Sequence, residues 1–303
     1  MRFGICIPQF VEDAAFDPGA LHGFLARAEA HGFESAWTQE QVLGTMPNLG
    51  PLETMAYAAA CTSTIRLGCA VLITTLHSPV HLAKSIGTLD QLSRGRIDVG
   101  VGTGGRRMFS AFGVDPDSFV ARFTEGLELM KALWTQPEVK FAGRFWQVDG
   151  AAMEPKPFQK PYPPLWFGGN APAALRRAVR HGDGFIGAGS QTTAAFAAQV
   201  PVVREALAEQ GRSGFRIAKR VYLAVDDDAA RARERLSAAL HRLYGFFRLP
   251  DLTPVTVSGP PAACVEGLRA VADAGAEMIL LNPLFDEAEQ MERLAAEVMP
   301  HLA

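Results

Sequence analysis

Cysteine is scarce in this chain, and its acidic and basic residues nearly balance. The four cysteines among 303 residues lie far apart, without a Cys-x-x-Cys spacing, at Cys6, Cys61, Cys69 and Cys264. This spacing argues against a disulfide framework, a zinc site or a redox pair, so we expect four small buried core residues. With 29 basic and 32 acidic residues the net charge is −3, which provides no electrostatic attraction for nucleic acid or an acidic membrane.

Long apolar segments are also lacking. No stretch approaches the length that crosses a bilayer, and residues 1–8 lack the basic region, long apolar run and cleavage site of a secretion signal. We therefore expect a cytoplasmic protein that uses no membrane. Hydrophobic residues make up 48% of the chain and charged residues 20%, which is enough to bury a large core. The length suits one domain spanning residues 1–303.

Short β-rich runs alternate with helical patterns along the whole chain. Strands are predicted at residues 3–7, 35–37, 67–73, 97–101, 165–167, 184–186, 217–225 and 278–281. Helices are predicted at residues 21–31, 52–62, 80–92, 119–133 and 173–181, each ending at a stop signal or a turn. Eight strands with helices between them predict a closed (β/α)8 TIM barrel. A doubly wound sheet is the structural alternative, which the even strand spacing disfavours.

Residues 138–164 interrupt this alternation between the fourth and fifth strands. Within this segment, residues 139–148 predict a β-hairpin that turns at Ala142-Gly143. Five prolines follow between Pro155 and Pro164, a composition typical of loops. We therefore predict an insertion between two barrel strands.

Polar and glycine-rich residues follow several of the predicted strands. They are Gln39-Glu40-Gln41 after the second, Thr74-Thr75-Leu76-His77 after the third, Thr103-Gly104-Gly105-Arg106-Arg107 after the fourth and Gly168-Gly169-Asn170 after the fifth. Barrel enzymes place their chemistry at these carboxyl ends. The last of the four segments precedes a helix, whose unpaired first N–H groups favour a phosphate. The alternative is that the two glycines only make a tight turn.

Gly100, Gly102 and Gly105 match the Gly-x-Gly-x-x-Gly pattern of dinucleotide-binding folds. A nicotinamide-binding fold places this motif in its first crossover unit, directly before a helix. Here the motif lies in the fourth predicted strand, and the next helix begins only after Pro116. The match is therefore weak, and we expect a glycine-rich turn on which a ligand lies against backbone.

Six segments spread over nearly the whole chain form one pattern. They are Gly4-x-x-x-Pro8, Ala28-Glu29-x-x-Gly32-Phe33-Glu34-Ser35-Ala36-Trp37, Leu89-Asp90-Gln91-Leu92-Ser93-x-Gly95-Arg96, Gly100-Val101-Gly102-Thr103-Gly104, Pro163-Pro164-Leu165-Trp166-Phe167-Gly168-Gly169-Asn170 and Gly182-Asp183-Gly184-Phe185. Together they resemble the luciferase-like monooxygenase superfamily, whose (β/α)8 barrels bind flavin mononucleotide (FMN) or the deazaflavin coenzyme F420. The resemblance implies an oxidoreductase that uses F420, with FMN as the alternative cofactor.

The resemblance also implies a place for each part of the cofactor. A bulge at Ala70-Val71 in the third strand, often with a non-prolyl cis peptide, would back the tricyclic ring, with Leu72 beside it. Thr103 and Gly104 would lie along the ribityl chain and the ring edge. The phosphate would be held by Gly168, Gly169 and Asn170, in agreement with the helix-start argument. For Thr103 the alternative is a turn hydroxyl that bonds its own backbone.

The candidate catalytic residues follow the second strand. Many relatives carry Asp-His or Glu-His there, whereas this chain has Glu40-Gln41. Glu40 is the candidate acid or base, and Gln41, which cannot exchange a proton, can hydrogen-bond the cofactor ring or a substrate carbonyl. Relatives that oxidise sugar phosphates use a glutamate after the fourth strand. This chain has Arg106-Arg107 in that loop, which disfavours a sugar phosphate.

Further side chains are predicted at the rim of the site. Arg106 and Arg107 suit an anionic substrate or the acidic tail of a deazaflavin, and a solvated loop pair is the alternative. His77 is predicted to contact the pocket. His77 and His81 have a spacing that can bind metal on a helix face, but no glutamate follows the first histidine, so we predict no metal site.

These observations together predict hydride transfer between F420 and a small organic substrate. Residues 43–49 and 243–254 are apolar, with Phe246 and Phe247 among them, and predict a hydrophobic substrate side. The first alternative is a two-component monooxygenase that uses reduced FMN and oxygen. The second is a flavin-binding protein without activity, because Gln41 stands where relatives have histidine. The resemblance further implies a homodimer, and a flavin or F420 reductase as a partner.

Overall fold

The computed structural model describes residues 1–11, 16–44, 46–245 and 252–302. Eight parallel strands follow one another around a barrel, and the last of them, β9, pairs again with β11. In barrel order they are β11 (Met278–Asn282), β1 (Arg2–Cys6), β2 (Ser35–Thr38), β3 (Arg66–Ile73), β4 (Ile97–Gly102), β7 (Leu165–Gly168), β8 (Gly184–Gly187) and β9 (Arg216–Val225). The predicted TIM barrel is confirmed. A further strand that was not predicted, β10 (Thr256–Gly259), pairs with the last residues of β9.

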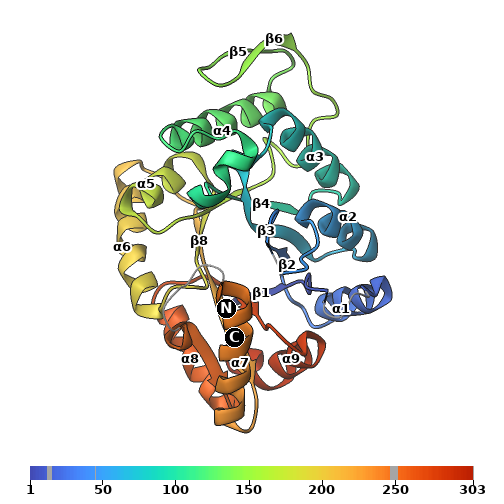
Figure 1. The fold of residues 1–303 in the computed structure, drawn as a ribbon, viewed down its shortest axis with the longest axis vertical. Helices are drawn as coiled ribbons and strands as arrows, with labels where there is room; N and C mark the ends of the chain where they lie inside the picture. Colours follow the sequence, from blue (N-terminus) through green and yellow to red (C-terminus); the bar gives the residue numbers. More distant parts are fainter. Residues whose placement is uncertain (12–15, 45, 246–251, 303) are drawn as a thin grey trace.

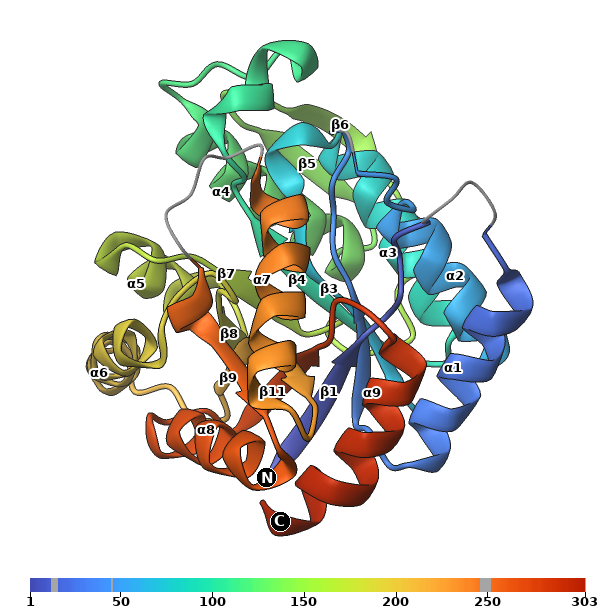
Figure 2. The ribbon, with the colours of Figure 1, turned by 60° about the horizontal axis from the view of Figure 1, so that its bottom comes forward.

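Helices surround the barrel on all sides (Figures 1 and 2). Their bounds are α1 (Pro18–Ala30), α2 (Pro51–Cys61), α3 (Pro79–Leu92), α4 (Phe119–Thr135), α5 (Pro172–His181), α6 (Thr193–Glu209), α7 (Ala229–Tyr244), α8 (Pro261–Asp273) and α9 (Glu287–Arg293). Short helical turns are η2 (Thr74–Leu76), η3 (Arg106–Phe112), η5 (Thr253–Val255), η6 (Leu294–Val298) and η7 (Met299–His301). Five of the long helices begin with proline, which suits the first turn because its N–H has no partner there. The prediction found the first five helices and missed α6 to α9.

The predicted hairpin lies between β4 and β7, beyond α4 in Figure 1. It consists of β5 (Val139–Ala142) and β6 (Gln147–Ala151), and Ala142 pairs with Gln147. The turn therefore lies at residues 143–146, and the predicted turn at Ala142-Gly143 is wrong. The reason is a side chain from α4, since the Glu125 carboxylate accepts the backbone N–H groups of Phe145 and Trp146 at 2.8 and 2.9 Å.

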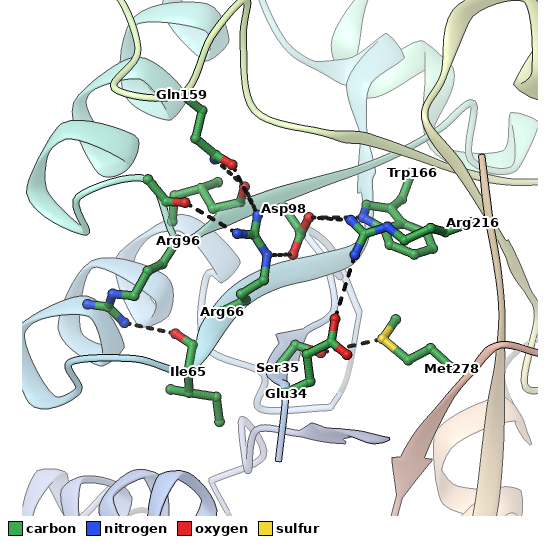
Figure 3. A network of polar contacts seen from close by, with 12 residues as sticks. Glu34, Ser35, Ile65, Arg66, Arg96, Asp98, Gln159, Trp166, Arg216 and Met278 are labelled. Atoms are coloured by element: carbon green, nitrogen blue, oxygen red, sulfur yellow. Dashed lines mark hydrogen bonds and ion pairs between the residues drawn. The ribbon is translucent and has the colours of Figure 1, made fainter. Parts of the chain in front are cut away.

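A polar network lies at the amino ends of the barrel strands (Figure 3). Its centre is Asp98, whose side chain is 2% exposed and accepts from Arg66 Nε at 2.7 Å and Trp166 Nε1 at 3.0 Å. Arg216 joins Asp98 to Glu34, at 3.5 and 3.6 Å. Asp98, Arg66, Arg216 and Glu34 each have an opposite charge beside them, as buried charges require. The network closes this end of the barrel, so a ligand site is expected at the other end.

Among the described residues, buried hydrophobic side chains form three clusters. The largest lies between the strands and the helices, and a second fills the barrel interior with Cys6, Trp37, Trp166, Ile186, Ala218, Met278 and Leu280. The third lies between β9 and α7 and consists of Tyr222, Ala224, Ala232, Leu236 and Leu240. In the interior the rings of Trp37 and Trp166 meet edge to face, with centroids 5.9 Å apart.

All four cysteines are free; three are buried as predicted, whereas Cys61 is half-buried. Within the described residues, no helix has the length and apolar character needed to cross a membrane.

Candidate active site

The carboxyl-end half of β3 is irregular. Its pairing with β4 shifts register between Cys69 and Leu72, and the Ala70-Val71 peptide bond is cis. The predicted bulge and its non-prolyl cis peptide are thus confirmed. A bulge takes residues out of the regular ladder and re-aims them. Here Ala70 and Val71 line the two cavities described below.

Glycines in β4 make room for this bulge. A Cβ at Gly102 would lie 2.7 Å from Cγ2 of Val71, and a Cβ at Gly100 would collide with the carbonyl oxygen of Cys69. Gly104 adopts a positive φ of 67° at the turn that follows, a conformation that favours glycine. Two of the three glycines in the dinucleotide-like pattern, Gly100 and Gly102, therefore reflect packing between β3 and β4. The alternative of a doubly wound dinucleotide-binding fold does not hold, because the sheet closes into a barrel.

The first cavity, which we call the glycine-rich cavity, has a volume of about 280 Å³. It lies at the ends of β3, β4, β7 and β8 and includes seven of the predicted cofactor residues: Ala70, Val71, Thr103, Gly104, Gly168, Gly169 and Asn170. Its described lining contains no carboxylate and one cation, Arg220. An anionic ligand therefore meets no like charge there.

The second cavity, which we call the wide cavity, has a volume of about 490 Å³. It shares Ala70, Val71, Gly104, Arg220 and Tyr244 with the glycine-rich cavity, so the two meet at the bulge. Its further lining includes three predicted residues, Glu40, Gln41 and Arg107, and the apolar side chains Leu43, Met46, Ile73, Met108 and Leu243. The predicted hydrophobic side is thus present among the described residues, whereas Phe246 and Phe247 lie outside them.

Glu40 is the buried carboxylate of the wide cavity. Its side chain is 2% exposed, and its Oε1 lies 2.8 Å from Nε2 of His77. Its Oε2 accepts the backbone N–H of Ile73. Both oxygens are therefore held in place, and the half-buried imidazole is the only titratable side chain bonded to this carboxylate among the described residues. The pair can hold a proton next to a ligand.

Comparison with known proteins decides the family. The family model for luciferase-like monooxygenases matches residues 1–251. The chain belongs to this family. The F420-dependent glucose-6-phosphate dehydrogenase of Kineococcus radiotolerans is 28% identical over 320 residues, which cover 95% of this chain and 94% of that protein.

Three solved structures share the luciferase-like fold over nearly the full length. The monooxygenase RslO1 from Streptomyces bottropensis has a TM-score of 0.87 at 25% identity and full coverage of both chains. An F420-dependent secondary alcohol dehydrogenase, solved with an F420-acetone adduct, has a TM-score of 0.86 at 19% identity, with coverage of 100% and 99%. The 3,6-diketocamphane monooxygenase from Pseudomonas putida, solved with FMN, has a TM-score of 0.82 at 19% identity, with coverage of 99% and 98%. The predicted family and oxidoreductase class are confirmed.

Three predicted site residues lie outside both cavities of this luciferase-like barrel. Leu72 is 1% exposed and packs into the layer between strands and helices, because the extra residue of the bulge turns it to the same side as Leu67 and Cys69. Arg106 lies over the ring of Phe119, with its Cζ 5.3 Å from the centroid. His77 contacts Glu40 instead of lining the cavity. The predicted cofactor contact of the Leu72 side chain is therefore not supported.

Two residues that line both cavities were not named as site residues, although Tyr244 lies in the segment 243–254 that was predicted to form the hydrophobic substrate side. Arg220 comes from β9 and Tyr244 from the end of α7, where its hydroxyl lies 2.5 Å from that of Tyr222. A signal for Arg220 was present, because Lys219-Arg220 interrupts an otherwise apolar strand. For Tyr244 the signal was the segment 243–254 as a whole, and its exact position depends on how α7 packs on the luciferase-like barrel.

Proposed function

We propose that this protein transfers a hydride between coenzyme F420 and a small, largely apolar organic substrate. The observation that carries the proposal is the meeting of two unlike cavities at the Ala70-Val71 bulge. The glycine-rich cavity has no described carboxylate, and the wide cavity holds the buried Glu40. A long anionic cofactor fits this arrangement: the glycine-rich cavity would hold its phosphate end, and Ala70 and Val71 would hold its ring next to the wide cavity.

The glycine-rich cavity supports binding of a phosphate. Gly168, Gly169 and Asn170 come directly before α5, whose first N–H groups and positive dipole end favour an anion. A Cβ at Gly169 would lie 2.9 Å from that of Ala174, so the glycine lets the turn pack closely against the first turn of α5. Thr103 and Gly104 continue the cavity toward the bulge, and we assign them to the ribityl chain. The Thr103 hydroxyl lies 3.5 Å from the Gly104 carbonyl oxygen, too far for a strong competing bond.

Two observations support F420 and an apolar substrate. The F420-dependent relative from Kineococcus radiotolerans matches 95% of this chain. When bound, a deazaflavin exchanges a hydride with a substrate and, unlike reduced FMN, reacts poorly with oxygen. The wide cavity has an apolar wall that includes Leu43, Met108 and Leu243, which suits a less polar substrate than a sugar phosphate.

We assign proton transfer to Glu40. Oxidation of an alcohol removes a hydride from carbon and a proton from oxygen, and reduction of the ketone returns both. The Glu40 carboxylate lines the wide cavity and is bonded to His77, so a proton taken from the substrate oxygen has a second acceptor next to it. Gln41 lines the same cavity, where its amide can donate to a substrate carbonyl.

A turnover assay tests this function. The purified protein is incubated without oxygen with F420 and a panel of apolar secondary alcohols, or with reduced F420 and the matching ketones, while the deazaflavin absorbance is followed. We expect turnover in both directions, and a loss of turnover in Glu40→Gln with cofactor binding retained. Turnover only with reduced FMN, accompanied by oxygen consumption, would contradict the proposal.

A monooxygenase that uses reduced FMN is the second candidate. It is favoured by the likeness to RslO1, which extends over the full length of both chains. The same bulge and glycine-rich cavity would then serve FMN. A flavin-binding protein without activity is less well supported, because the Glu40 and His77 pair supplies a proton-transfer group where Gln41 does not.

A further inference from the structure

Arg220 lies where the two cavities meet. It is the fifth residue of β9, its side chain is half-buried, and it lines both the glycine-rich and the wide cavity. Its Nη1 donates to the carbonyl oxygen of Ala70 at 3.2 Å, which belongs to the cis peptide of the bulge. The guanidinium is thus tied to the backbone on which we place the cofactor ring.

Among the described residues, the hydrogen-bond partners of this guanidinium are neutral. Besides Ala70, its Nη2 donates to the side-chain oxygen of Gln39. With the Asn282 amide oriented so that its oxygen faces Arg220, that oxygen accepts from Nη2 at 2.7 Å and from Nε at 2.9 Å. In the described part of the chain, no carboxylate forms an ion pair with Arg220. An arginine keeps its positive charge at any ordinary pH.

The other interior arginine of β9 differs from Arg220 because it has carboxylate partners. Arg216, four residues earlier, is paired with Asp98 and Glu34 at the amino end of the barrel (Figure 3). Glu40 is the one carboxylate in the described lining of either cavity, and its oxygens are bonded to His77 and Ile73 instead. A cation that is largely removed from water without a counter-charge is unfavourable by itself and attracts an anion.

We propose that Arg220 balances the negative charge that the cofactor ring gains on reduction. A hydride carries two electrons and one proton, so a ring that accepts it gains one negative charge unless a second proton follows. A fixed cation at the ring stabilises the reduced form more than the oxidised form and raises the midpoint potential of the bound cofactor. Arg220 is thereby a positioning and potential-setting residue. This inference rests on the proposed function.

Binding of the two redox forms tests the inference without turnover. Oxidised and reduced F420, and oxidised and reduced FMN, are titrated anaerobically into wild type, Arg220→Met and Arg220→Lys, and the midpoint potential of each complex is measured. We expect Arg220→Met to weaken the reduced form at least tenfold more than the oxidised form. For a two-electron couple this factor corresponds to a fall of about 30 mV in potential. Arg220→Lys keeps the charge and is expected to retain most of the preference.

Arg216→Met is the matched control, because it removes an arginine from the same strand outside both cavities. Its ratio of reduced to oxidised affinity is expected to equal that of wild type. If Arg220→Met does not fold, Arg220→Gln is compared with Arg220→Lys in the same titrations. Equal weakening of both redox forms overturns the inference and leaves the proposed function standing. Failure of wild type to bind either cofactor overturns both.

Discussion

Nε2 of His77 lies 2.8 Å from Oε1 of Glu40, although 37 residues separate them along the chain. The two residues follow β2 and β3, which are neighbours in the barrel and pair from Ser35 with Arg66 to Thr38 with Cys69. Their loops therefore emerge side by side. The imidazole of His77 thus reaches the Glu40 carboxylate from the loop after the neighbouring strand. The residue directly after Glu40 is Gln41, which cannot exchange a proton.

Replacing either member of this pair is expected to slow turnover. Glu40→Gln keeps the size of the side chain and removes its proton chemistry, so kcat is expected to fall by about 10² to 10⁴, the usual range for a general acid or base. His77→Gln is expected to lower kcat less, because Glu40 remains. Steady-state kinetics over a range of pH, with cofactor affinity measured separately, check both. His81→Gln is the control, since His81 is exposed on α3. Unchanged turnover in Glu40→Gln would remove Glu40 from the chemistry.

Substitution of Gly102 is expected to destabilise the bulge. In Gly102→Ala the new methyl group would lie 2.7 Å from Cγ2 of Val71, and overpacking of this kind costs about 1 to 3 kcal/mol. Thermal and denaturant unfolding measure the loss. The double variant Gly102→Ala/Val71→Ala lacks the opposing methyl groups and is expected to regain part of the lost stability. Gly105→Ala has open space around its Cβ and serves as control; equal stability of both glycine variants would contradict this packing account.

Lys219 is expected to make stability depend on pH. It is 2% exposed, and its Nζ donates to the carbonyl oxygens of Ala188 and Arg220. Burial, with a smaller contribution from the nearby Arg220 guanidinium, lowers the pKa of Lys219 to about 7. The unfolded chain therefore binds more protons than the folded one between about pH 7 and the ordinary lysine pKa, and the free energy of unfolding rises with pH across that window.

Lys219→Met tests this dependence. Each pKa unit corresponds to about 1.4 kcal/mol. Within the window, the lysine is therefore expected to raise the free energy of unfolding by about that amount for each pH unit. The methionine variant should lose this slope and be more stable than wild type at neutral pH. Denaturant unfolding at several pH values measures both quantities. A slope that persists in the variant would assign the pH dependence to another group.

The sequence pattern predicted the architecture closely, for physical reasons. Parallel strands that are buried on both faces are continuous apolar runs, such as the one at residues 278–281, and all eight predicted barrel strands correspond to strands of the structure. The turn at residues 168–170 was predictable because two glycines between an apolar run and a helical pattern mark the change from strand to helix. The turn at residues 143–146 was missed because Glu125 in α4 determines it.

Contacts between distant residues account for most of what the sequence left unpredicted at the site. Arg220 contacts Ala70, Gln39 and Asn282, which come from three other strands or their loops. Its position at the cavities therefore depends on how these strands are arranged in the barrel. Leu72 was predicted at the cofactor from the family resemblance, yet the register shift of the bulge turns it into the core. Such placements depend on strand register, which a local pattern does not contain.

The most direct test of the account is a paired equilibrium titration of the purified protein with oxidised F420 and with FMN, followed by fluorescence and thermal shift. We expect F420 to bind at least tenfold more tightly, a difference of about 1.4 kcal/mol. Tighter binding of FMN would contradict the deazaflavin assignment and favour oxygen-dependent chemistry. Binding of neither would remove the assignment of Gly168, Gly169 and Asn170 to a cofactor phosphate.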